Sequence, residues 1–229
     1  MDYELFKSIV EEASHYGPRS FSLHLFGEPL LYPHILDAIA FIKAKNKRHT
    51  VLLTTNGVLL NRYVEDLLKV RVDKIIWSWR KNNFTERTKE VLKEKGKIRF
   101  LIEETPEGEI EKWKDAKDVE IKHLHSYGGS IDVSKWKVPK PPKRHACYHL
   151  WLAPAVRWNG EIVECCNLSK SGEDVLGRYG ETNISEVWNG EDIRKLRESH
   201  MKGIYPGKCG ACTSWQAYPD IFFKSQKHG

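Results

Sequence analysis

The stretch FSLHLFGEP, residues 21–29, reads as an apolar strand that ends in a Gly-Glu-Pro turn. Gly27 permits the backbone to bend there, and Pro29 cannot continue a strand, so the turn leads from a strand toward a helix. The carboxyl ends of parallel strands are where α/β sheets bind ligands. Gly27 and Glu28 are therefore candidate binding residues, although a plain strand-to-helix turn has the same pattern.

Outward from this turn, strand and helix patterns alternate along the first half of the chain. Apolar runs predict strands over residues 20–26, 51–54, 74–79, 98–102 and 119–124. Apolar residues at helical spacing predict helices over residues 3–15, 33–42, 60–70, 85–95 and 109–116, the first with Asp2 as its N-cap. Strands that alternate with helices indicate a parallel sheet with right-handed crossovers.

The regular pattern ends in a stretch of glycine, proline and lysine over residues 127–144, which is typical of a linker. Beyond it, Asn159-Gly160 predicts a tight β-hairpin, and residues 184–200 predict one helix. We therefore expect a barrel-like domain over residues 1–128, a linker over 129–146 and a small cysteine-rich domain over 147–229.

Four of the five cysteines are spaced C-x17-C-x43-C-x2-C over the last third of the chain, at Cys147, Cys165, Cys209 and Cys212. Zinc ribbons normally supply two tight cysteine pairs, whereas iron–sulfur clusters tolerate scattered thiolates. The spacing therefore favours a cluster only slightly, and a structural zinc site stays open. Chemistry alone does not decide between Cys165 and its neighbour Cys166, which would point to the opposite side of a strand.

Composition narrows the classes of partner. The 229-residue chain has a net charge of +6, but its basic residues alternate with acidic ones along predicted helices, which is typical of a solvated surface rather than a nucleic-acid site. No run approaches the roughly 18 apolar residues of a membrane span, and no signal-peptide pattern opens the chain. We expect a cytoplasmic protein that binds neither nucleic acid nor a membrane, with thiols rather than a disulfide framework.

Two further features accompany the Gly-Glu-Pro turn. Thr55-Asn56-Gly57 follows the next strand, and Ser78 lies within the third. With the cysteine set, this combination resembles a radical S-adenosylmethionine (SAM) protein with a C-terminal Twitch or SPASM auxiliary-cluster extension, over nearly the whole chain. The resemblance implies an α/β fold: a partial (β/α)6-type, TIM-like barrel missing its first strand, followed by a small cysteine-rich domain with a β-hairpin and a helix.

The same resemblance implies roles for individual residues. Those expected to contact SAM are Gly27, Glu28, Asn56 and Ser78. Those expected to ligate an auxiliary [4Fe-4S] cluster are Cys147, Cys165, Cys209 and Cys212, because the spacing of the Twitch pattern favours Cys165 over Cys166. Catalytic residues are not assigned.

The family's C-x3-C-x2-C loop, which holds the SAM-cleaving cluster, is expected before the first helix, whereas this chain opens at Met1 with that helix already beginning. SAM is therefore expected as a cofactor only together with such a segment, and both a fragment of a complete enzyme and a derivative that has lost SAM chemistry fit the sequence. A missing first strand would also leave residues 20–26 as an unpaired edge, so we expect self-association or coverage by another segment.

The function implied by the resemblance is radical modification of a peptide, protein or small alcohol substrate by an oxidoreductase or maturase, with a possible electron-donor protein as partner. The alternative is a non-catalytic iron–sulfur binding or electron-transfer module. A third interpretation places zinc in the cysteine site and gives it no redox role.

Overall fold

The computed structural model describes residues 1–78, 90–93, 96–103, 119–122, 144–167, 174–213 and 215. The chain divides into two compact units, residues 1–123 and residues 124–229, and each is described by itself. Among the helices that the structure describes, none combines the length and the hydropathy that crossing a membrane requires.

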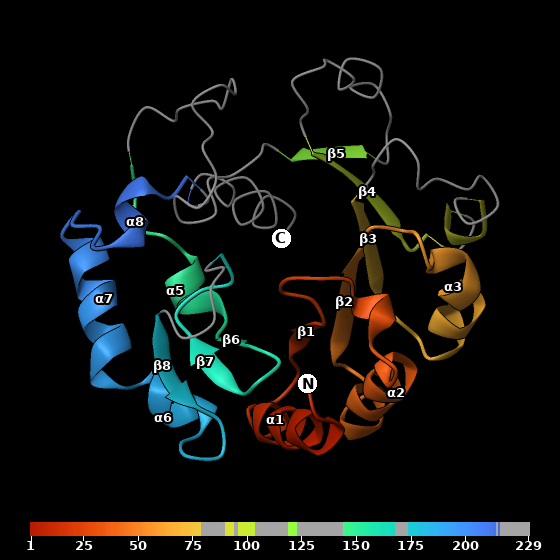
Figure 1. Ribbon diagram of the computed structural model, residues 1–229, viewed down its shortest axis with the longest axis horizontal. Helices are drawn as coiled ribbons and strands as arrows, with labels where there is room; N and C mark the ends of the chain where they lie inside the picture. The colour runs from red at the N-terminus through yellow and green to blue at the C-terminus, as the bar shows by residue number, and fades with distance from the viewer. Residues whose placement is uncertain are drawn as a thin grey trace. The chain divides into compact units, whose positions relative to one another are not determined.

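The first unit is built on a parallel sheet whose strands follow one another in the order β1-β2-β3-β4-β5 (Figure 1). Its strands are β1 Ser20–Ser22, β2 Thr50–Thr55, β3 Lys74–Ser78, β4 Ile98–Glu103 and β5 Val119–Lys122. The predicted α/β fold with a parallel sheet is confirmed. The strand β1 is shorter than the predicted range 20–26, because its pairing with β2 ends after Ser22, with one further hydrogen bond of 3.0 Å from Leu23 N to Leu52 O.

Three helices of this unit are α1 Tyr3–His15, α2 Ile35–Lys45 and α3 Leu60–Lys69, and a short 3-10 helix, η1 Pro29–Leu31, follows the Gly-Glu-Pro turn. The predicted cap of α1 is present: the Asp2 carboxylate accepts hydrogen bonds from Glu4 N at 2.9 Å and Leu5 N at 3.0 Å. Of the predicted helix 85–95 the structure describes a helical segment at 90–93, and the predicted helix 109–116 lies outside the described residues.

The sheet has two different faces. The face toward α2 and α3 is apolar and completely buried at Val51, Leu53, Ile75 and Trp77 (Figure 1). The opposite face is only partly buried at the alternate positions Leu52, Thr54, Ile76 and Ser78. Since successive side chains of a strand point to opposite faces, the polar Thr54 and Ser78 lie on the less covered side.

The second unit carries the antiparallel sheet β6-β7-β8, with strands β6 Ala155–Val156, β7 Glu161–Val163 and β8 Val175–Arg178. The predicted hairpin around Asn159-Gly160 is present, and Gly160 has the positive φ of 85° that such a turn demands. An ion pair with 2.9 Å between Arg157 Nη1 and Glu161 Oε2 closes the hairpin, and both side chains are buried. The third strand, β8, was not predicted.

The single helix predicted over residues 184–200 is wrong. The structure has two helices, α6 Ile184–Trp188 and α7 Glu191–Met201, which Asn189 and Gly190 separate. Gly190 adopts an extended ψ of 171°, and a Cβ at this position would lie 3.1 Å from the carbonyl oxygens of Glu186 and Val187. A helix cannot continue through an extended residue, so a second helix, α7, starts at Glu191. The last helix that the structure describes is α8 Lys208–Ala211.

Candidate functional site

Glu28 joins the Gly-Glu-Pro and Thr-Asn-Gly turns at the carboxyl edge of the parallel sheet. One carboxylate oxygen accepts the Asn56 N–H at 2.7 Å, while the other accepts the Thr55 hydroxyl at 2.7 Å and the Leu30 N–H at 3.1 Å. Hydrogen bonds to an ionised carboxylate are about twice as strong as those between neutral groups. Glu28 therefore holds the Gly-Glu-Pro turn after β1 against the Thr-Asn-Gly turn after β2.

Trp77 packs against the Thr-Asn-Gly turn and holds it in place. The indole Nε1 donates a hydrogen bond of 3.3 Å to the Asn56 carbonyl, and the ring lies where a Cβ at position 57 would be, 2.0 Å from Nε1. Gly57 has a φ of 82°, in the region that favours glycine. Glycine is thus required here both by the backbone and by the packing of Trp77.

The four predicted SAM-contacting residues are all at the carboxyl ends of neighbouring strands. Gly27 and Glu28 follow β1, Asn56 follows β2, and Ser78 ends β3 next to Trp77, which pairs with Thr55 of β2. The structure brings Glu28 and Asn56 into direct contact and leaves Ser78 partly buried at the end of its strand. Their role toward SAM stays a prediction.

Sequence reasoning assigned no role to His24. Its Nε2 lies 3.0 Å from the Thr54 hydroxyl, and its Nδ1 lies 3.5 Å from the Ser22 hydroxyl. Phe21 and Leu23 pack against the apolar core of the unit, so the alternation places Ser22 and His24 on the opposite, less covered side of the sheet. Period-two alternation from Ser22 is the sequence signal that could have found it.

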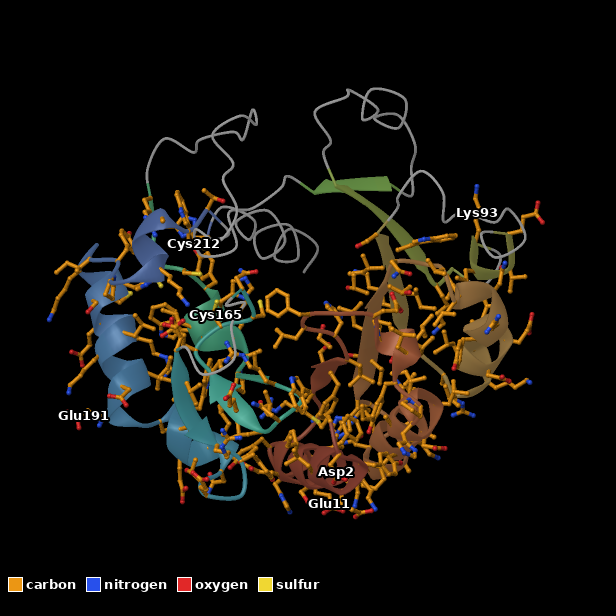
Figure 2. All side chains as sticks on the ribbon, in the orientation of Figure 1. Asp2, Glu11, Lys93, Cys165, Glu191 and Cys212 are labelled. Atoms are coloured by element: carbon orange, nitrogen blue, oxygen red, sulfur yellow. The ribbon has the colours of Figure 1, made fainter. Side chains whose placement is uncertain are left out.

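The five cysteines gather in the second unit, and all are free thiols. Burial, with smaller contributions from the neighbouring Cys212 and Cys166, raises the pKa of Cys147 to about 11. Burial also raises the pKa of Cys165, with added contributions from Cys166, Cys147 and Cys212. Cys209 has its pKa raised to about 12, first by burial and then by Glu164 and by Cys212. These mutual effects require that the thiols lie near one another, and Figure 2 labels two of them, Cys165 and Cys212, in the second unit.

The two adjacent hairpin cysteines have different partners. Cys165 Sγ accepts a hydrogen bond from Asn167 N at 3.2 Å, whereas Cys166 Sγ lies 3.6 Å from His149 Nδ1. A backbone N–H that points at sulfur favours the thiolate form that ligates metals. The expected opposite directions require a strand through both cysteines, whereas β7 ends at Val163 and both lie in the segment that follows it. The choice of Cys165 as the ligand stays a prediction.

Two nitrogen-bearing side chains flank the cysteines, and sequence reasoning missed both. Arg144 donates from Nη2 to the Cys209 carbonyl and from Nη1 to the Gly210 carbonyl, the latter at 2.9 Å. His200 is buried, and its Nδ1 accepts the Cys147 N–H at 3.3 Å. The available signal was the position of Arg144 three residues before the first cysteine.

The donor set fits an iron–sulfur cluster. In the part of the chain that the structure describes, no three His, Cys, Asp or Glu side chains are already arranged around one metal ion. Cys147 and Cys209 nevertheless lie near other thiols, and burial raises the pKa of both. Cysteines ligate a metal as thiolates, so cluster binding releases their protons. The buried Arg144 Nε and His200 Nε2 also lack a hydrogen-bond partner among the described residues. The sulfurs of a cluster would provide acceptors for such N–H groups.

Comparison with known proteins agrees with this chemistry. Residues 147–213 match the SPASM family model, which is described as an iron–sulfur cluster-binding domain. Residues 147–213 form a SPASM domain. The matched range begins at Cys147 and includes all five cysteines of the chain. An iron–sulfur cluster is therefore the cofactor of this domain, and the zinc interpretation is disfavoured.

Two kinds of relative extend the comparison. GTP 3',8-cyclase of Chlorobaculum tepidum is 43% identical over 49 residues, which span 21% of this chain and 15% of the cyclase. The crystal structure of BtrN in complex with AdoMet and 2-DOIA matches with a TM-score of 0.70 at 20% identity, covering 93% of this chain and 80% of BtrN. An open conformation of BtrN matches with a TM-score of 0.60 at 18% identity over the same shares.

The likeness to BtrN shows a shared mixed α/β fold. Together with the SPASM domain and the match to the cyclase, it confirms the predicted resemblance to radical SAM proteins that carry a SPASM domain.

Proposed function

We propose that this chain is a radical SAM/SPASM-type protein that takes part in radical modification of a substrate and holds one auxiliary [4Fe-4S] cluster. The observation that carries the proposal is that five half-buried free thiols lie within the SPASM domain, several of them close enough to affect one another's pKa. The proposed ligands are Cys147, Cys165, Cys209 and Cys212, with Cys166 beside His149 instead. We also place the protein in the cytoplasm, since free thiols suit a reducing compartment.

The proposed SAM-binding edge lies at the carboxyl ends of β1, β2 and β3. The five parallel strands in sequential order support a partial barrel of the TIM-like type that lacks its first strand. Glu28 ties the first two turns together there, so that Gly27 and Asn56 are held in fixed positions, and Ser78 stands at the end of the next strand. In this scheme Glu28 acts by ordering the backbone to which the methionyl part of SAM binds.

When bound, an auxiliary cluster supplies an electron acceptor for a substrate radical or helps to hold the substrate. Substrate classes that fit are a peptide, a protein or a small alcohol, and an electron-donor protein would be a partner. The likeness to BtrN, whose crystal structure holds 2-DOIA, supports the small-molecule class.

Metal analysis of anaerobically reconstituted protein tests the cluster. We expect about four iron and four sulfide per chain and visible absorption that bleaches on reduction. Cys209→Ala and Cys212→Ala should lose the cluster, and Cys166→Ala, the matched control, should retain most of it. Colourless protein with one zinc per chain would refute the proposal. Equal loss from Cys165→Ala and Cys166→Ala would refute the choice of hairpin ligand.

A second candidate function is a non-catalytic iron–sulfur module. The observation that favours it is that residues 1–146 contain no cysteine, so the cluster that cleaves SAM has no ligands within them. We expect this chain by itself to form no 5′-deoxyadenosine from SAM under strong reductant. Calorimetry then separates the candidates, because SAM binding supports the first and its absence the second. Formation of 5′-deoxyadenosine above a protein-free control would contradict the expectation.

A further inference from the structure

The guanidinium of Arg144 connects two segments that each carry cysteine. Arg144 precedes Cys147 by three residues, yet its Nη1 and Nη2 donate to the carbonyls of Gly210 and Cys209 in the Cys209–Cys212 turn. The planar fork of an arginine suits two neighbouring carbonyl acceptors, which a lysine cannot bind in the same way. The segment of the first cysteine and the turn of the last two are thus held together by one cation.

Aromatic contacts fix the position of this cation. Arg144 Cζ lies 3.8 Å from the centroid of the Tyr205 ring and 5.5 Å from that of Trp215. The His200 ring meets the same Tyr205 ring edge-on at 5.0 Å, and His200 Nδ1 accepts the Cys147 N–H. A guanidinium held over aromatic rings and bonded to two carbonyls has little freedom to turn toward solvent.

The charge of Arg144 lies beside two of the proposed ligands, because its guanidinium donates to the carbonyl of Cys209 and its own segment leads to Cys147. Arginine stays protonated in proteins, whereas a cluster bound by four thiolates is a net anion that becomes more negative on reduction. A fixed positive charge beside such a group stabilises the reduced state more than the oxidised one.

Two buried nitrogen atoms at this site, Arg144 Nε and His200 Nε2, have no hydrogen-bond partner among the described residues. Because His200 Nδ1 accepts the Cys147 N–H, the proton of the neutral ring is on Nε2. Both atoms are therefore donors, and N–H donation to the sulfurs of a cluster also raises its reduction potential.

We propose that Arg144 is a positioning residue that holds the Cys209–Cys212 turn against the Cys147 segment and, through its charge, raises the reduction potential of the auxiliary cluster. This inference rests on the proposed function, since it requires the cluster. Arg144 thereby influences how readily the cluster accepts an electron.

The test measures the midpoint potential of the reconstituted cluster in wild type, Arg144→Gln and Arg144→Lys by redox titration followed by electron paramagnetic resonance. Gln retains a hydrogen-bond donor without the charge, and Lys retains the charge without the fork. The matched control is Arg194→Gln, an exposed residue near the Glu191 end of α7 (Figure 2). Arg194 is six residues before His200, roughly 9 Å along the helix axis.

We expect Arg144→Gln to lower the equilibrium constant for one-electron reduction of the cluster roughly tenfold, which is a negative shift of about 59 mV in its midpoint potential. Arg144→Lys and Arg194→Gln should stay within about threefold of wild type, since both keep a cation at position 144. Potentials of Arg144→Gln and wild type that coincide at equal iron content would overturn the proposal. If Arg144→Gln fails to hold iron, full iron content in Arg144→Lys supports the role of the charge, and equal loss in both variants refutes it. Wild type that takes up no iron would instead refute the proposed function, and the inference with it.

Discussion

Replacing Gly57 by alanine adds one methyl group where the structure has no room for it. The new Cβ would lie 2.0 Å from Trp77 Nε1 and 2.4 Å from Cε2, far inside van der Waals contact. Trp77 belongs to β3, and its side chain is buried in the core on the face of the sheet toward α2 and α3, so it cannot move into solvent. Gly27 provides the matched control, because it also has a positive φ, 95°, yet has nothing within 4 Å of an added Cβ.

The two substitutions separate backbone strain from steric overlap. A left-handed conformation costs a non-glycine residue about 1–2 kcal/mol, and both variants bear this cost. Only Gly57→Ala also overpacks the core, at about 1–3 kcal/mol, and breaks the Trp77–Asn56 hydrogen bond of 3.3 Å, at about 1 kcal/mol. We therefore expect Gly57→Ala to destabilise the first unit by roughly 2–4 kcal/mol more than Gly27→Ala.

Urea titration followed by far-ultraviolet circular dichroism measures the free energy of unfolding of both variants and of the wild type. A larger loss in Gly57→Ala at an unchanged dependence on urea would agree with the overlap. Equal losses in the two variants would show that Trp77 does not pack against Gly57, and the account of the Thr-Asn-Gly turn would then be wrong.

Three further predictions concern charged and titrating groups. Glu28→Gln should destabilise the first unit by about 1–3 kcal/mol in the same titration, since charged hydrogen bonds to Asn56 and Thr55 become neutral ones. Arg157→Met should destabilise the second unit by about 1–3 kcal/mol because the buried Glu161 loses its partner at 2.9 Å and retains Arg178 Nη2 at 3.5 Å, and Arg157→Met with Glu161→Met should recover most of the loss in melting temperature. Burial lowers the pKa of His49, so the stability that its neutral ring contributes is complete above the unfolded pKa of about 6.5 and is lost as the pH falls through the lowered pKa of the folded state. In His49→Gln the free energy of unfolding should therefore fall less on acidification through this range.

Individual residues show how far sequence reasoning reached. The N-cap at Asp2, the strands of the parallel sheet and the turn at Gly160 follow from local preferences, because a cap, an apolar alternation or a positive φ involves only a few neighbouring residues. The break at Gly190 was missed, since apolar spacing on both sides of it suggested one continuous helix. The carbonyl oxygens of α6 leave little room for a Cβ at position 190, and no spacing rule reveals such a contact.

The sequence by itself determined which residues are candidates to meet a ligand: four spaced cysteines, and turns placed after successive strands whose carboxyl ends share one edge. Only the tertiary structure decided what holds them. Glu28, expected to contact SAM, places both its oxygens on hydrogen bonds within the protein, and Arg144, far from Cys209 along the chain, lies against it. These partners are 27 and 65 residues apart in the sequence and become neighbours only when their units fold, so a local sequence pattern does not reveal the contacts.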